Sequence, residues 1–215
     1  MARNVEVYRS LQSADAQALS IFALACAERG SGIFRTVASS ADREWYSRIL
    51  ELAWRAAVGE AAEDELVEVI DEFETRAGSS EDDEGDDPDS REFSALQSAM
   101  LAVNAIAVYL SPSPARAELS GQTLETLLSS FDFKLGGSRA VIVSAGESGP
   151  PPGPLQQMEQ DAQTAIMREI ANGAELSSEF LDSLRTTCQI ARDDIAAATL
   201  AVAEVSGWDT VDTED

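Results

Sequence analysis

Apolar residues recur at helical spacing along nearly the whole chain, and the segment Ala41–Val58 shows this pattern most strongly. Its apolar positions cover well over one helix face; they are Trp45, Tyr46, Ile49, Leu50, Leu52, Ala53 and Trp54. A helix that is apolar over so much of its circumference is covered by neighbours on several sides. We therefore expect Ala41–Val58 to form the central helix, capped by Ser39 or Ser40 and ended by Gly59.

The same spacing predicts further helices before and after this segment. Their ranges are residues 1–12, Ala14–Arg29, Ala61–Arg76, Arg91–Leu110, Gly121–Leu135, Leu155–Ala171, and a last helix from Ser177 or Ser178 to Val205. Gly30 and Gly32 are expected to break the helix that precedes them. The stretch Ala140–Val143 has β-like residues, but an isolated strand has no partner, so helix or irregular structure is equally consistent there.

These patterns predict an all-α fold, a single-domain bundle of about seven or eight helices. The domain is expected to cover residues 1–207, with an acidic loop at 79–90 and a Gly/Pro-rich loop at 136–154. An acidic tail follows at 208–215.

Two of the helices have apolar positions that predict which face points inward. In Arg91–Leu110 the positions repeat like the seam of a coiled coil; they are Phe93, Leu96, Met100, Val103 and Ala107. In Leu155–Ala171 the expected inward residues are Met158, Ala162, Ala165, Ile166 and Ile170. The seam of Arg91–Leu110 therefore predicts that this helix packs lengthwise against another.

The charge of the chain limits what it can bind. It has 39 acidic and 15 basic side chains, a net charge of −24. Phosphate contacts need Lys and Arg, so this balance argues against nucleic acid or an anionic membrane as a direct partner. It permits a basic protein partner, steered by the field of the protein, although the charge by itself favours a solvated acidic surface that serves solubility.

The residue types exclude several kinds of catalytic and metal site. The chain has no histidine, which excludes a His base, a Ser–His or Cys–His pair and His metal ligands. The acidic run Ser79–Ser90 fails the calcium-loop pattern, because with Gly85 in the glycine position Arg91 stands where the bidentate Glu belongs. We expect no metal, no cofactor and no catalytic residues.

Cysteine usage and hydropathy indicate a compartment. Cys26 and Cys188 lie in apolar helical runs and are interpreted as buried structural thiols, which fits a reducing environment. The first residues have no long apolar core, and the apolar stretch Ala99–Leu110 is interrupted by Asn104 and too short to span a bilayer. A cytoplasmic location is expected.

Four strings along the chain carry a family resemblance: ALACAER at Ala23–Arg29, YSRILELAW at Tyr46–Trp54, FSALQSAMLA at Phe93–Ala102 and LSGQTLE at Leu119–Glu125. In this order they resemble domain-of-unknown-function family 416, the YjaG-like bacterial proteins. The segment Ala140–Pro154 departs from the family in being richer in Gly and Pro. The resemblance implies an all-helical cytosolic fold and supplies no catalytic residues.

The charged positions within those strings are Arg29, Arg48 and Glu51. We interpret each of them as part of a buried or half-buried ion pair that orients helices rather than as part of a functional site.

The densest negative region is the helix Ala61–Arg76 together with the loop after it. We propose this region as a partner-binding surface formed by Asp64, Glu65, Glu68, Asp71, Glu72, Glu74, Glu81, Asp82, Asp83 and Glu84. Like charges three and four positions apart cost a helix a few tenths of a kcal/mol per pair, so stability alone would favour some Lys here.

Two functional hypotheses follow from this region. The first is a non-enzymatic binding protein, in sharper form an inhibitor or immunity protein for a basic toxin or nuclease, by analogy with proteins that imitate a phosphate backbone. The second is a dimeric interaction or scaffold protein whose acidity serves only solubility.

Overall fold

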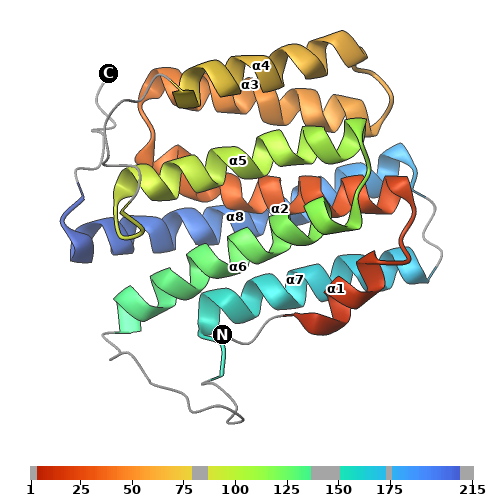
Figure 1. Cartoon of the computed structure of the whole chain (residues 1–215). Coiled ribbons are helices and arrows are strands. Elements are labelled where there is room, and N and C mark those ends of the chain that lie inside the picture. The colour runs from red at the N-terminus through yellow and green to blue at the C-terminus, as the bar shows by residue number, and fades with distance from the viewer. Residues whose placement is uncertain (1–3, 79–86, 137–150, 173–175, 209–215) are drawn as a thin grey trace.

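In the computed structural model the chain folds into a bundle of helices, described over residues 4–78, 87–136, 151–172 and 176–208 (Figure 1). The described residues form eight α-helices and no strand. The helices are α1 (Val5–Leu11), α2 (Ala16–Val37), α3 (Ser40–Ala57), α4 (Glu63–Gly78), α5 (Arg91–Leu110), α6 (Pro114–Gly136), α7 (Pro154–Ala171) and α8 (Ser178–Ser206). The all-α prediction is confirmed, while Ala140–Val143 lies outside the described residues.

The ends of the helices follow local chemistry. Ser39, Ser90 and Ser177 each accept a backbone N–H from the first turn of the helix that they precede. The sequence names Ser39 and Ser177 each as one of two candidate caps. Helix α8 ends at Gly207, whose φ of +67° is a left-handed conformation that glycine adopts without strain. These contacts satisfy backbone groups that the helix ends would otherwise leave without partners.

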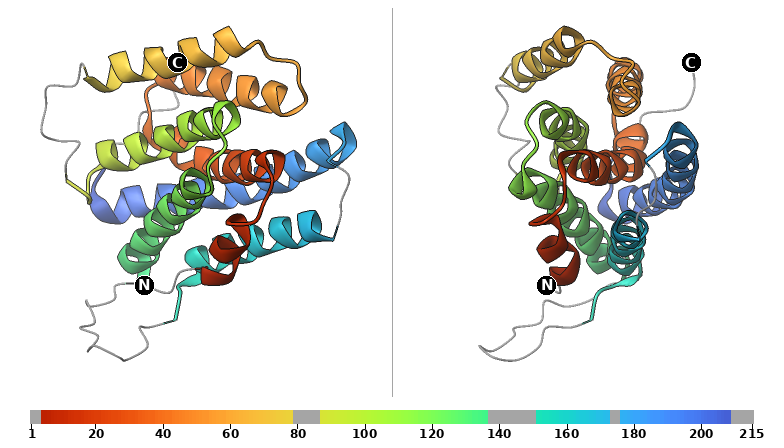
Figure 2. Two further views of the ribbon diagram at one scale, coloured as in Figure 1. Left: turned by 45° about the vertical axis from the view of Figure 1, so that its right-hand side comes forward. Right: turned by 90° about the vertical axis from the view of Figure 1, so that its right-hand side faces the viewer.

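The central element is α2, and the prediction that Ala41–Val58 occupies the centre is wrong. Helix α2 packs against α3, α5, α6, α7 and α8, with α5 on one side and α8 on the other (Figure 2). All but two of the residues from Ala18 to Val37 are buried. Half of their side chains are small, which lets neighbouring helices approach closely, whereas α3 lies towards one edge of the bundle, beside α4 (Figure 1).

Gly30 and Gly32 do not break α2, which continues through both of them. A Cβ on Gly32 would lie 2.3 Å from the backbone oxygen of Arg192, and one on Gly30 would lie 2.5 Å from a methyl group of Leu101. The two glycines are therefore points of close approach to α8 and α5. Tertiary packing outweighs the preference of about 1 kcal/mol that glycine has against a helix interior.

Helix α5 turns a different face inward than its larger apolar residues predict. Leu96 and Met100 are 36% and 42% exposed, so the predicted seam is wrong at these two positions. The buried positions include Ser94, Ser98 and Ala102. Such small side chains let α5 come close to α2, and Ser98 donates its hydroxyl to the Gly30 carbonyl at 2.7 Å.

Helix α5 is also, among the described helices, the one long and apolar enough to cross a membrane. The sequence analysis considers only the apolar stretch Ala99–Leu110, which is too short to span a bilayer, whereas the whole helix has 20 residues. Half of the relevant window is buried inside the bundle, and the core helix of a water-soluble protein meets the same length and composition criteria.

Candidate functional site

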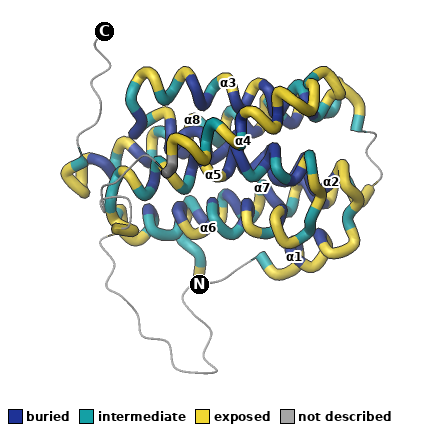
Figure 3. The backbone as a smooth tube through the Cα atoms, turned by 45° about the horizontal axis from the view of Figure 1, so that its top comes forward, coloured by how far each residue is buried: buried dark blue, intermediate teal, exposed yellow. Residues whose placement is uncertain are grey.

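The acidic surface predicted from the sequence lies on the outer face of α4, at the edge of the bundle (Figure 3). Leu66 and Val69 are buried, and Ile70 and Phe73 pack on the core beside them. This apolar stripe fixes the rotation of α4 about its axis and leaves the opposite side in water. Five of the predicted carboxylates are exposed and Glu72 is half-buried; the exposed ones are Asp64, Glu65, Glu68, Asp71 and Glu74.

Two of these carboxylates pair with arginines. Glu72 accepts from Arg48 of α3 at 2.6 Å and forms an ion pair with Arg76 at 3.3 Å, while Glu65 lies 3.5 Å from Arg55. The other four have no ion pair with any described residue; they are Asp64, Glu68, Asp71 and Glu74. We call these four the free carboxylates of α4. The predicted residues Glu81, Asp82, Asp83 and Glu84 lie outside the described residues.

A groove of about 340 Å³ lies between α3 and α4, beside the free carboxylates. Its lining residues are Arg48, Glu51, Leu52, Arg55, Glu65, Glu68, Val69 and Glu72. Leu52 and Val69 are buried and give the groove apolar groups, while four carboxylates and two guanidinium groups surround them. This composition suits the apolar stem and cationic head of a Lys or Arg side chain.

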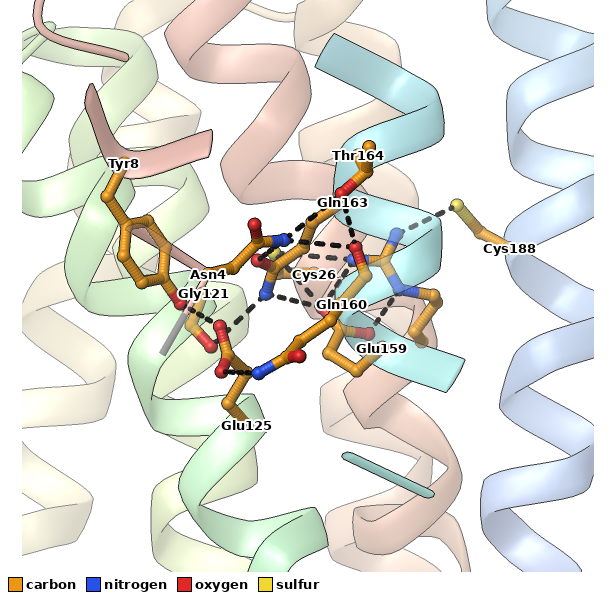
Figure 4. Close-up of polar contacts among 11 residues, drawn as sticks. Asn4, Tyr8, Cys26, Gly121, Glu125, Glu159, Gln160, Gln163, Thr164 and Cys188 are labelled. Atoms are coloured by element: carbon orange, nitrogen blue, oxygen red, sulfur yellow. Dashed lines mark hydrogen bonds and ion pairs between the residues drawn. The ribbon is translucent and has the colours of Figure 1, made fainter. Parts of the chain in front are cut away.

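A second polar cluster, which the sequence analysis did not identify, is buried among α1, α2, α6 and α7 (Figure 4). At its centre Arg29 donates to Glu159 through Nε at 2.7 Å and through Nη2 at 2.6 Å. The exposed fractions of the two side chains are 1% and 0%. Removal from water disfavours the charged guanidinium, but the attraction of Glu159 outweighs this effect and holds the pKa of Arg29 above its usual range.

Helix α7 presents a polar face to this pair. Its buried residues include Gln156, Glu159 and Gln163, so the predicted inward face is wrong at Ala165, which is exposed, and incomplete elsewhere. Gln163 donates to Glu159 at 3.0 Å. The start of α7 is held against α6 by Asp132, whose carboxylate accepts the backbone N–H groups of residues 155 and 156.

The cluster continues to the N-terminal helix. Tyr8 of α1 donates its hydroxyl to the buried Glu125 of α6, which also accepts from Gln160 at 2.8 Å. Burial, followed by the hydrogen bond and the charge of Glu125, raises the pKa of Tyr8 well above its usual value. Gly121 makes room for this arrangement, because a Cβ there would lie 2.9 Å from the Tyr8 ring.

Both cysteines lie against the guanidinium of Arg29. Cys26 and Cys188 are free and buried, as the sequence predicts, at 3.5 Å from Nη2 and 3.6 Å from Nη1. Burial is the largest influence on each thiol and raises its pKa, against the opposing effect of the Arg29 charge. Both sulfurs are therefore held as neutral thiols, a form with little nucleophilic reactivity.

A third carboxylate, Glu28, is buried on another side of α2. It accepts from the Trp54 indole at 2.6 Å and from Arg192 of α8 at 3.3 Å, so it ties α3 and α8 to α2. Arg185 of α8 pairs with Glu51 of α3 in the same region. All three predicted residues form ion pairs between helices, but the expected burial is confirmed only for Arg29, because the side chains of Arg48 and Glu51 are exposed.

The three buried carboxylates all have hydrogen-bond partners within the protein. Glu28, Glu125 and Glu159 each accept hydrogen bonds from residues on other helices. Within the described residues no group of three or more Asp, Glu, Cys or His side chains could hold a metal ion. Comparison of the chain with protein-family models, curated proteins and solved structures finds no match, so the resemblance to family 416 stays a prediction.

Proposed function

We propose that the protein binds a basic protein partner through the free carboxylates of α4 and the groove beside them. The observation that carries the proposal is that Asp64, Glu68, Asp71 and Glu74 are exposed and form no ion pair with any described residue. Glu68 lies three or four positions from Asp64 and Asp71, so these charges repel one another along the helix. Binding of a cationic partner relieves this repulsion, whereas the unbound helix retains it.

The groove adds a second element of recognition. Exposed charges alone steer association and contribute little affinity, because water and salt screen them. Leu52 and Val69 supply apolar contact next to the carboxylates, so a Lys or Arg side chain can bury its stem there. The ion pairs of Arg48 and Arg55 hold the walls of the groove and leave the free carboxylates available.

The sharper form of the proposal is an inhibitor or immunity protein that covers the basic surface of a toxin or nuclease. Its support is the net charge of −24 together with a helix whose carboxylates are spaced along one rigid face. Such a partner associates quickly at low salt and more slowly as the ionic strength rises. A cytoplasmic location fits the two free thiols and belongs to the same proposal.

A charge-matched pair of variants tests this function. The test variant removes three free carboxylates of α4 by Glu68→Gln, Asp71→Asn and Glu74→Gln. The control removes three exposed carboxylates of α8 by Asp182→Asn, Asp194→Asn and Glu204→Gln, so both variants change the net charge by the same amount. Each protein is immobilised and exposed at low salt to an extract of the source cell, and the retained proteins are identified by mass spectrometry.

The proposal expects one basic protein to be retained by the wild type and by the α8 variant, to be lost by the α4 variant, and to elute as salt is raised. Equal retention by the two variants would show that only the net charge matters and would refute a site on α4. Retention of acidic or neutral proteins alone would refute the partner class.

The dimeric alternative is favoured by one observation. Leu96 and Met100 lie one turn apart on α5 and are exposed, although their spacing predicts burial. A second copy of the chain could cover them. Light scattering tests this directly: a dimer that Leu96→Gln with Met100→Gln converts to a monomer supports the scaffold function, and a monomeric wild type rules it out.

A further inference from the structure

A cavity of about 130 Å³ lies between α7 and α8, and it shares no lining residue with the acidic groove. Both α7 and α8 pack against α2 and α6, and the cavity is the space left between α7 and α8. Ile166, Phe180 and Leu184 form apolar walls, and alanines from both helices keep the space open. A cavity of similar volume in another protein takes up a molecule about the size of benzene.

The inner end of the cavity is polar. Arg29 and Cys188 line it there, and both side chains are almost fully buried. Nη1 of Arg29 carries two N–H groups, and its one partner among the described residues is the Cys188 sulfur at 3.6 Å. Sulfur is a weak acceptor, so this nitrogen retains capacity to donate to a better one.

The charge state of that end selects for a neutral ligand. Glu159 already neutralises Arg29 through two short hydrogen bonds, and Cys188 is held as a neutral thiol. A carboxylate entering the cavity would therefore bring an unpaired charge out of water, which is costly. Exposed Glu169 beside the opening would repel it further.

From this geometry we propose that the cavity binds a compact neutral molecule with an apolar ring or branched body and a single carbonyl or ether oxygen, which accepts a hydrogen bond from Arg29 Nη1. The apolar body lies against Ile166, Phe180 and Leu184. The exposed residues Ser183 and Thr187 lie at the opening through which the ligand enters. This site is separate from the α4 surface and does not depend on the function proposed for it.

The first test uses the wild-type protein and three probes of similar size: cyclohexanone, methylenecyclohexane and cyclohexanecarboxylate. Methyl NMR signals of Ile166 and Leu184 report occupation, and the side-chain N–H signals of Arg29 report the hydrogen bond. Cyclohexanone is expected to shift both sets. The hydrocarbon, compared at concentrations within its solubility, should bind roughly tenfold more weakly, and the carboxylate more weakly still.

The second test fills the cavity. Ala162→Leu on α7 places three more carbons in the cavity and should weaken the binding of cyclohexanone at least about tenfold. Ala191→Leu on α8 tests the same expectation independently. The matched control is Ala197→Leu, an exposed position of α8 that does not line the cavity, and it should leave binding unchanged. Circular dichroism checks that each variant is folded.

Three results would overturn the proposal. They are the absence of any shift with cyclohexanone, equal or tighter binding of the hydrocarbon or the carboxylate, and unchanged binding in both folded cavity-filling variants. The wild-type comparison of probes needs no substitution, so it decides the ligand class even if both fillers unfold.

Discussion

Replacing one member of the buried ion pair between Arg29 and Glu159 should destabilise the protein more than replacing both members. The pair joins α2 to α7 through two hydrogen bonds of 2.6 and 2.7 Å, with both side chains out of water. We consider three variants: Arg29→Met, Glu159→Met, and the double variant. Methionine is unbranched and adaptable, so it can occupy the space of either long side chain.

The loss in free energy of unfolding depends on which charge each variant leaves buried. Charges roughly 4 Å apart attract by about 4 kcal/mol at the effective dielectric constant that describes such sites. Loss of one partner leaves a buried charge without compensation and costs about 3–5 kcal/mol. Glu159→Met should be the more costly, because an arginine cannot release its proton, whereas Glu159 left alone can take one up.

The double variant loses the attraction between the two charges, but it also avoids the cost of removing both charges from water, so the two changes largely cancel. The main remaining cost is about 1 kcal/mol, because Gln163 loses Glu159 as a hydrogen-bond acceptor. This cost stays small because Gln163 still donates to the Gly121 carbonyl at 3.4 Å. The free energy of unfolding of the double variant should therefore lie within about 2 kcal/mol of the wild type.

Urea unfolding followed by tryptophan fluorescence and by circular dichroism measures all four proteins. A coupling energy of about 3 kcal/mol or more between the two sites is expected, and so is a folded double variant when a single variant is unfolded. Additive single and double changes would refute the reasoning, because they would mean that the two charges do not depend on each other.

Further predictions concern packing, pH and charge. Gly32→Ala should lower the free energy of unfolding by about 1–3 kcal/mol, since its Cβ meets the backbone of α8, while Gly30→Ala meets only a side chain and should cost less in the same urea experiment. The folded protein raises the pKa values of Cys26, Cys188 and Tyr8, so these groups keep their protons while the unfolded chain loses them. Stability should hold below about pH 9, the ordinary thiol value, and fall above it by about 1.4 kcal/mol per pH unit for each thiol, and Tyr8 should add to the fall only above about pH 10; alkaline unfolding curves of the wild type and Cys188→Ala would show this. Neutralising the three α4 carboxylates of the binding test should stabilise the protein by a few tenths of a kcal/mol through reduced repulsion, read as a higher thermal midpoint at low salt that converges with the wild type as salt is added.

Most of the helices could be predicted because their signals are local, but some of their ends could not: α2 continues through Gly30 and Gly32, and α6 begins at Pro114 rather than at Gly121. The serine caps of α3 and α8 and the apolar stripe of α4 depend on residues a few positions apart, and the structure has each of them. The exposed carboxylates of α4 follow from the same stripe. This part of the candidate site is therefore accessible from a single sequence.

What the sequence could not provide depends on helices that are distant along the chain. Gly32 reads as a helix breaker until the backbone of α8 is placed against it, 160 positions later at Arg192. Glu159 stands among polar residues and looks like a surface position, because only the arrival of Arg29 makes its burial favourable. The string Glu28-Arg29 inside an alanine-rich apolar run was the available signal, since two adjacent charges in a buried helix require partners.

The central claim is that the free carboxylates of α4 contact a basic protein, and site-specific photo-cross-linking in the source cell tests it most directly. A photoreactive phenylalanine replaces Asp71 on α4 in one variant and Asp194 on α8 in the other, both at exposed positions. We predict a discrete adduct with one basic protein from position 71 and none from position 194. No adduct at position 71, equal adducts from both positions, or an acidic protein in the adduct would contradict the claim.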